Sequence, residues 1–130
     1  MALTHVTTTR NAMCDACVDR IDLGTTDATG DLITMTSGDV EVSAHLHTNP
    51  AYGNTGAVTA GLATAAAIGS DVTPAGGTMA LYKQQDRDNG EVMRGTITAT
   101  SGGGDIEFSS IVIAVTDTVQ VDSLTYTAST

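Results

Sequence analysis

The chain has 130 residues, with 5 Lys and Arg against 15 Asp and Glu, and its formal net charge is -10. This balance argues against nucleic acid or an anionic membrane as a partner, because such a surface needs clustered Lys and Arg. With no Trp, one Phe and three Tyr, the core must consist of small and β-branched residues. The length predicts a single domain spanning residues 1–130.

The N-terminal residues 1–7 carry neither a basic segment nor an apolar run, so they are predicted to form a polar arm rather than a targeting signal. No stretch approaches the roughly 20 apolar residues that a membrane span requires. We therefore expect synthesis in a cytoplasm and no association with a membrane.

Residues 8–23 predict an amphipathic helix that begins at a threonine cap and ends before Gly24. The helix has an acidic stripe of Asp15, Asp19 and Asp22. Its apolar stripe, at three- and four-residue spacing, consists of Met13, Cys14, Cys17, Val18 and Ile21.

After a connector over residues 25–30, apolar residues recur with the period of a β-strand. Residues 40–47 predict a strand with Val40, Val42, Ala44 and Leu46 on one face and His45 and His47 on an outward, solvated face. The Asn-Gly step within residues 86–90 predicts a hairpin turn. Further strands are predicted over residues 32–36, 57–68, 78–84, 91–98, 106–115 and 119–127, the second of which could instead be helical because it is rich in Ala.

Roughly six to eight short strands of this spacing favour a mainly β fold. The prediction is a single β-sandwich, jelly-roll or Ig-like, over residues 31–128, preceded by one N-terminal α-helix.

The pair Cys14-x-x-Cys17 allows three interpretations. A zinc site could form if His45 and His47 completed four ligands. The thiols could instead pack as small apolar side chains, or they could form a disulfide between neighbouring copies. Redox catalysis is disfavoured, because the cysteines lie inside the helix on its apolar stripe and not at its N-terminus.

Two loops have simpler explanations than ligand binding. Residues 86–91 resemble the start of a calcium loop, but Ile97 stands where a bidentate Glu is needed, and a turn explains the same residues. Residues 101–105 lack the Lys and helix of a phosphate loop and are interpreted as a flexible connection. The sequence also has no Gly-x-Ser-x-Gly elbow. We therefore expect no enzymatic activity, and neither catalytic residues nor a bound metal or cofactor.

Two segments, residues 9–24 and Asn49-Pro50-Ala51-Tyr52-Gly53, resemble a family of small structural proteins encoded in the head-gene region of tailed bacteriophages and prophages. Weaker matches occur at residues 67–71, 77–78, 86–90 and 123–127. The sequence departs from the family pattern at Cys14 and Cys17, where the family has Ala and Leu, and in a shorter loop between Thr36 and Val40.

The resemblance implies a capsid decoration or cement protein that binds the major capsid protein on the exterior of the virion. It also implies a homo-oligomer, with a trimer favoured. Cys14 and Cys17 become candidates for an inter-subunit disulfide. The expected interface residues are Leu3, His5, Val6, Met13, Val18 and Ile21. Two alternatives stay open: a tail or neck component of the virion, and a small metal-binding or redox module that uses Cys14 and Cys17.

Overall fold

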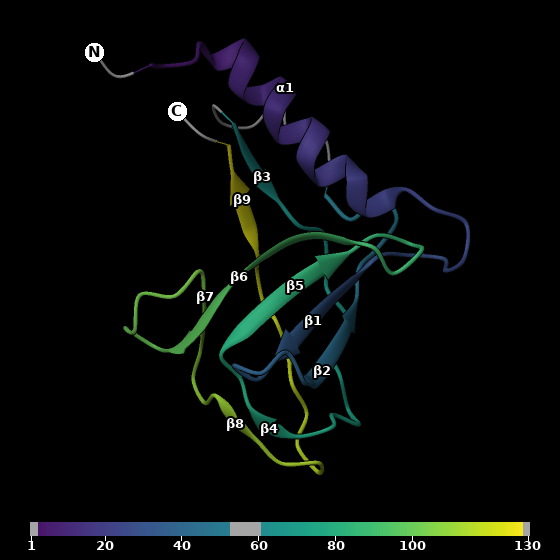
Figure 1. Ribbon diagram of the computed structural model, residues 1–130, viewed down its shortest axis with the longest axis vertical. Helices are drawn as coiled ribbons and strands as arrows, with labels where there is room; N and C mark the ends of the chain where they lie inside the picture. Colours follow the sequence, from purple (N-terminus) through teal and green to yellow (C-terminus); the bar gives the residue numbers. More distant parts are fainter. Residues whose placement is uncertain (1–2, 53–60, 129–130) are drawn as a thin grey trace.

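The computed structural model describes residues 3–52 and 61–128 (Figure 1). The chain begins with helix α1, Thr7–Val18, which continues into a 3-10 turn, η1, at Asp19–Asp22. The described residues then form nine strands: β1 Asp31–Met35, β2 Glu41–Leu46, β3 Leu62–Thr64, β4 Gly77–Thr78, β5 Leu81–Gln85, β6 Glu91–Ala99, β7 Ile106–Phe108, β8 Val112–Ile113 and β9 Thr125–Thr127.

The strands form one five-stranded sheet of order β2-β1-β5-β6-β7 and two short ladders, β3-β9 and β4-β8. Every pair is antiparallel except β6-β7. The predicted class, mainly β with one N-terminal helix, is confirmed, and the curled sheet is consistent with a β-sandwich-like domain. The first part of the predicted strand over residues 57–68 lies outside the described residues.

Helix α1 forms where the apolar period predicts it. Cys14, Val18 and Ile21, spaced by four and three residues, are fully buried, so this stripe faces the core. The predicted threonine cap is wrong: Val6 occupies the N-cap position, and no side chain caps the helix there. The helix packs against β3 and β9, as Figure 1 shows.

The inner face of the sheet is unexpectedly polar. Strand pairing places Leu32 opposite His45 and Gln84, and Thr34 opposite Ser43 and Tyr82. Paired residues share one face of a sheet, so these side chains all point into the core.

The predicted orientation of β2 is therefore wrong. His45 is fully buried and His47 is only 3% exposed, whereas Leu46 is 63% exposed. The register with β1 turns the polar side chains of β2 inward. Hydrogen bonds inside the core satisfy the Ser43 hydroxyl and the ring nitrogens of His45. A bulge between Thr34 and Met35 allows Val42 to stay buried despite the alternation.

The main core lies between the inner face of the sheet, α1 and the C-terminal segment. Its fully buried apolar side chains include Val18, Ile21, Leu32, Val42 and Ala51, and Tyr52 is almost fully buried. The motif Asn49-Pro50-Ala51-Tyr52 thus supplies core residues, and the Ala51 amide donates to Oδ1 of Asp22 at 2.8 Å. Among the described residues, none of the helices has the length and apolar character needed to cross a membrane.

Candidate functional sites

The N-terminal arm presents the exposed part of the predicted interface. Leu3 is 79% exposed and Val6 is 70% exposed, while Met13 is partly exposed on α1. His5 is half-buried. These four residues therefore lie where a second molecule could contact them.

Val18 and Ile21 lie in the core of the single chain. Both side chains are fully buried, and both are part of the core that α1 shares with the sheet. Their helical spacing identified the buried face correctly, and within this chain that face is covered by the chain itself. Their contact with another subunit stays a prediction.

The two cysteines attach α1 to β9. The Cys14 thiol lies 3.9 Å from the carbonyl oxygen of Tyr126, and Cys17 hydrogen-bonds with the Tyr126 side chain. That contact, with burial, raises the pKa of Tyr126 to about 12. Neither cysteine is in a disulfide in this structure. Cys14 is fully buried within its own chain, and the cross-link to a neighbouring subunit stays a prediction.

Further polar contacts fix the same helix to the ends of the β3-β9 ladder. Arg10 donates to the carbonyl of Ala128, and the Gly61 amide donates to the Asn11 side chain at 2.8 Å. The described residues include no group of three or more His, Cys, Asp or Glu that could hold a metal ion. The segment that carries the family resemblance is thus, in large part, a docking surface for the chain's own C-terminal strand.

A chain of hydrogen bonds runs through the core from Thr34 to Gly69. His45 Nδ1 lies 2.8 Å from the Gly69 carbonyl, which can only accept, so Nδ1 carries a proton. In the neutral imidazole Nε2 then accepts. The Ser43 hydroxyl, 2.9 Å from Nε2, must then donate to His45. Its oxygen consequently accepts from the Thr34 hydroxyl at 2.6 Å.

The Ser43–His45 pair has the contact distance of a nucleophile and its base. Both residues are fully buried, so a substrate has no access to the serine in this fold. The pair therefore acts in packing, where it satisfies polar groups that the sheet register turns inward.

His47 lies beside this chain in a different environment. In the described part of the chain, neither of its ring nitrogens completes a hydrogen bond. Its nearest aromatic neighbour is Tyr52, with ring centroids 5.9 Å apart. Burial is the main cause that lowers the pKa of His47 to about 4. The Gln84 side chain opposes the shift and His45 adds to it. Gln84 is already engaged, because it accepts from the Tyr52 hydroxyl and donates to Met93.

The predicted hairpin turn over residues 86–90 is confirmed, and it has a second role. Oδ1 of Asp86 accepts from the amides of Asp88 and Gly90, which closes the turn without an ion. Oδ1 of Asp88 accepts from the amides of Thr25 and Thr26, both at 2.8 Å. The turn therefore binds the connector that follows the helix, and these bonds hold the pKa of Asp88 below its usual value.

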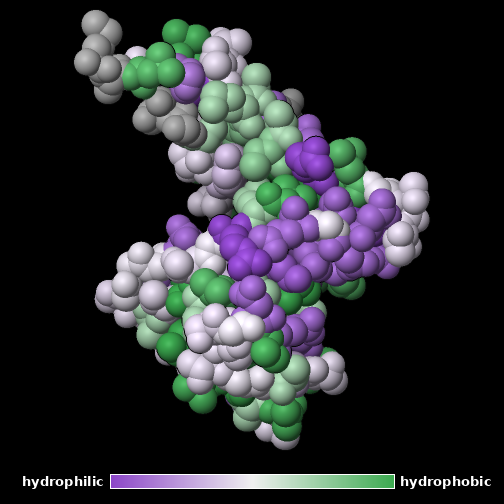
Figure 2. Space-filling view, viewed as in Figure 1, coloured by the Kyte–Doolittle hydropathy of each residue, from purple (hydrophilic) through white to green (hydrophobic). Residues whose placement is uncertain are grey.

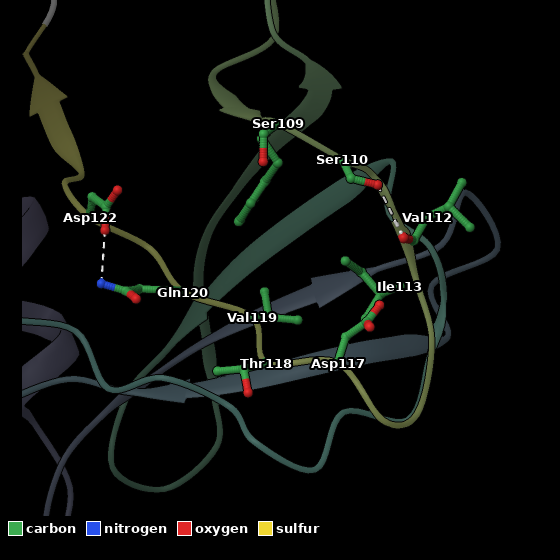
Figure 3. A pocket seen from close by; sticks show the side chains of 10 residues that line it. Ser109, Ser110, Val112, Ile113, Asp117, Thr118, Val119, Gln120 and Asp122 are labelled. Carbon is green, nitrogen blue, oxygen red and sulfur yellow. Dashed lines mark hydrogen bonds between the residues drawn. The ribbon is translucent and has the colours of Figure 1, made fainter.

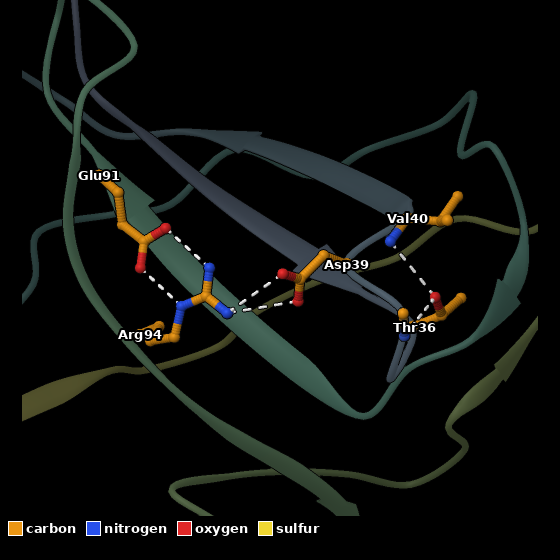
Figure 4. A network of polar contacts seen from close by, with 6 residues as sticks. Thr36, Asp39, Val40, Glu91 and Arg94 are labelled. Atoms are coloured by element: carbon orange, nitrogen blue, oxygen red, sulfur yellow. Dashed lines mark hydrogen bonds and ion pairs between the residues drawn. The ribbon is translucent and has the colours of Figure 1, made fainter.

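An ion-pair network lies on the outer surface of the sheet (Figure 4). Arg94 makes a two-pronged contact with Glu91 at 2.6 and 2.8 Å and also bonds Asp39 at 3.3 Å. These carboxylates raise the pKa of Arg94. The arrangement ties β6 to the β1–β2 turn and leaves the guanidinium engaged within the chain.

The glycine-rich loop over residues 101–104 is tied in place by its own chain. The Glu107 carboxylate accepts from the amides of Ser101 and Gly103, and the Thr98 hydroxyl accepts from the Gly104 amide. These amides are the groups that would hold a phosphate. The carboxylate occupies the anion's place, so the loop is a structured turn and the expected flexible connection is wrong.

On the face that Figure 2 shows, hydrophilic residues form a band across the middle of the molecule. Exposed apolar side chains include Leu23, Leu46 and Val72 as well as residues at both ends. One end carries the exposed Leu3 and Val6, and the other, beside β4 and β8, carries the exposed Val112 and Val115.

Two neighbouring hollows lie beside β7 and β8. One cavity of about 380 Å³ is lined by residues from both Phe108–Ile113 and Asp117–Asp122 (Figure 3). A second of about 260 Å³ continues from it along β7. Nothing in the sequence pattern indicated this feature.

No family model, no curated protein and no solved structure matches this chain.

Proposed function

We propose that this protein is a structural component of a tailed-phage virion that binds the outside of the head and stabilises it. The proposal begins from the resemblance carried by residues 9–24 and the Asn49-Pro50-Ala51-Tyr52 motif. On this proposal the principal partner is the major capsid protein. The chain acts by binding, in many copies and as a small oligomer, and not by catalysis.

The observation that carries the proposal is the exposed apolar arm. Leu3 and Val6 are exposed by 79% and 70% on an extended segment that precedes α1. Short exposed arms of this kind gain order and burial when they bind a neighbour. Apolar residues at the opposite end, Val112 and Val115, give the molecule a second place to contact an adjacent subunit.

The charge of the chain supports the outer surface of the head as its location. A protein of net charge -10 facing the interior would be repelled by packaged DNA, whose backbone carries one negative charge per phosphate. The same charge on the exterior has no such cost.

The stabilisation follows from mass action. A ligand that binds the assembled shell but not its separated subunits lowers the free energy of the shell by RT ln(1 + [L]/Kd) at each site. Many weak sites on one particle then add to a large total effect.

The proposal can be tested on particles of the phage whose genome encodes this chain. Particles made without the chain should disassemble at a lower temperature than complete particles, and added purified protein should restore the higher temperature. Protein lacking residues 2–5, which retains the N-cap residue Val6 and the whole of α1, should restore it less well. Equal stability with and without the chain would refute the proposal.

A further inference from the structure

Two segments near the C-terminus run side by side without pairing. Residues 106–113 and 117–123 are joined by a reversal at residues 114–117, where the Asp117 amide donates to the Ala114 carbonyl. Within the described residues, no ladder joins the two segments. The two cavities between them share Phe108, Ser109, Gln120 and Asp122, so they form one continuous hollow, which we call the C-terminal groove.

Both walls of the groove turn backbone groups toward it. On β7, the Phe108 carbonyl accepts from the Thr100 amide on the side of β6. Successive peptide groups of a strand alternate between its edges, so the backbone groups of Glu107 point away from β6 toward the groove. β7 is accordingly an unpaired edge strand of the sheet.

The opposite wall follows the same rule. The amide and carbonyl of Val119 both bond Asp71 on the far side of this segment. By alternation, the amides and carbonyls of Thr118 and Gln120 face the groove. They make no backbone hydrogen bond within the described part of the chain. A strand placed between the two walls would meet these backbone groups on both of its edges.

The floor and rim define the chemistry of an occupant. The buried Val119 and Val121 and the half-buried Phe108 form an apolar floor, of which Val119 is labelled in Figure 3. The groove is lined by Asp117 and Asp122, and by Glu107, whose carboxylate also accepts from the amides of Ser101 and Gly103. The groove lining contains no Lys, Arg or His, so its charge is negative. A complementary segment therefore has apolar residues on one face and Lys or Arg on the other.

We propose that the C-terminal groove accepts an extended, basic segment of another protein, which adds as a strand between β7 and residues 117–123. Backbone hydrogen bonds give such binding its affinity, and the alternate side chains give it specificity. A second copy of this chain is a poor donor, because it would bring a net charge of -10 toward an acidic rim. The inference goes beyond the proposed function, since it concerns the partner's chemistry whether or not the partner is a capsid protein.

The test uses synthetic probes, because the natural segment is unidentified. Three acetylated, fluorescent peptides of about nine residues, enough to span the groove, alternate Val with polar residues. One carries two Lys, one carries two Glu at the same positions, and one carries the two Lys with Pro at two central positions. Binding to the full chain is followed by fluorescence anisotropy at low and at moderate salt.

We expect the Lys peptide to bind at least tenfold more tightly than the Glu peptide and to weaken as salt is added. We expect the Pro peptide to bind at least tenfold more weakly than the Lys peptide, since it lacks the amides that a strand donates. Equal binding of the Lys and Glu peptides, or no binding by any peptide, would overturn the proposal. Full binding by the Pro peptide would exclude strand addition, and self-association of the chain that blocks the peptide would identify a second copy as the occupant.

A substitution that fills the C-terminal groove tests whether the peptide binds there. Ser109→Phe, at an exposed position that lines both cavities, should reduce Lys-peptide affinity at least tenfold. Ser37→Phe, at an exposed position in the β1–β2 turn, is the matched control and should leave it unchanged. Amide chemical shifts of the unmodified protein provide a second measurement: the peptide should perturb residues 106–109 and 118–122, and perturbations confined elsewhere would contradict the assignment.

Discussion

His47 shows, at the level of one residue, why the sequence pattern was insufficient. Alternation along β2 is visible in the sequence, but the pattern does not say which face the sheet turns inward. Apolar residues were expected inside, yet Ser43, His45 and His47 are buried and Leu46 is exposed. The reason is the pairing of β2 with β1, which in turn pairs with β5, a long-range property that residues 40–47 do not contain. The apolar stripe of α1, by contrast, depends only on local spacing and was largely predictable.

The burial of His47 makes stability depend on pH. The folded chain lowers the pKa of His47 from 6.5 to about 4, so the unfolded state takes up a proton first as the pH falls. The contribution of neutral His47 to the free energy of unfolding is complete above pH 6.5 and is lost progressively toward pH 4. From pH 7 to pH 5 the loss should be about 2 kcal/mol. Denaturant unfolding at both pH values measures it.

His47→Gln is the control for this dependence, because glutamine does not titrate. The variant starts from a different stability, so the comparison is the change between pH 7 and pH 5. That change should be smaller by about 2 kcal/mol in the variant. The same change in both proteins would show that other groups cause the acid sensitivity.

Gly95 leaves space that the Tyr82 ring requires. A Cβ at residue 95 would lie 2.6 Å from Cε1 of Tyr82 and 2.7 Å from Oδ2 of Asp105. Gly95→Ala should therefore lower the free energy of unfolding by about 1 to 3 kcal/mol. At Gly38 the nearest atom is 3.8 Å away, so Gly38→Ala should cost less than about 0.5 kcal/mol. Equal effects in denaturant unfolding would contradict the packing described for Gly95.

At the level of elements, local turn chemistry was the most reliable signal. The Asp and Asn-Gly residues between β5 and β6 predicted the hairpin, and Asn89 adopts the left-handed conformation, with a φ of 64°, that such turns use. The binding of this turn to residues 24–27 was not predictable, because it joins segments about sixty residues apart in sequence.

Asp88 provides a test of that contact between elements. Asp88→Ala removes the acceptor for the amides of Thr25 and Thr26, so hydrogen exchange at these two amides should become at least tenfold faster. Asp88→Asn keeps an oxygen acceptor and should preserve most of the protection. If both variants lost protection equally, the charge of Asp88 and not its hydrogen bonds would hold the connector.

The hydrogen-bond chain between β1 and β2 predicts an unequal effect of two neighbouring substitutions. Ser43→Ala leaves both the acceptor of His45 and the donor of Thr34 without a partner, which should cost about 1 to 3 kcal/mol. Thr34→Val removes only the terminal donor, so it should cost less. Denaturant unfolding of the two variants measures the difference, and a larger cost for Thr34→Val would contradict the direction assigned to the chain.

At the scale of the whole molecule, composition bears on the proposed partner and location and says nothing about shape. The charge of -10 favours an exterior, DNA-free location, and the shortage of aromatic residues is consistent with a small core. The distribution of exposed apolar residues at the two ends, and the C-terminal groove, arise from tertiary structure. Val18, Ile21 and Cys14 lie in the core of the single chain.

The central claim, a decoration protein on the outside of the head, is tested most directly by counting copies. Quantitative mass spectrometry of purified particles gives the ratio of this chain to the major capsid protein. The account predicts on the order of hundreds of copies per particle, as icosahedral decoration requires, whereas a ring at the neck or tail would give about six or about twelve. A count in that lower range, or the absence of the chain from particles, would contradict the account.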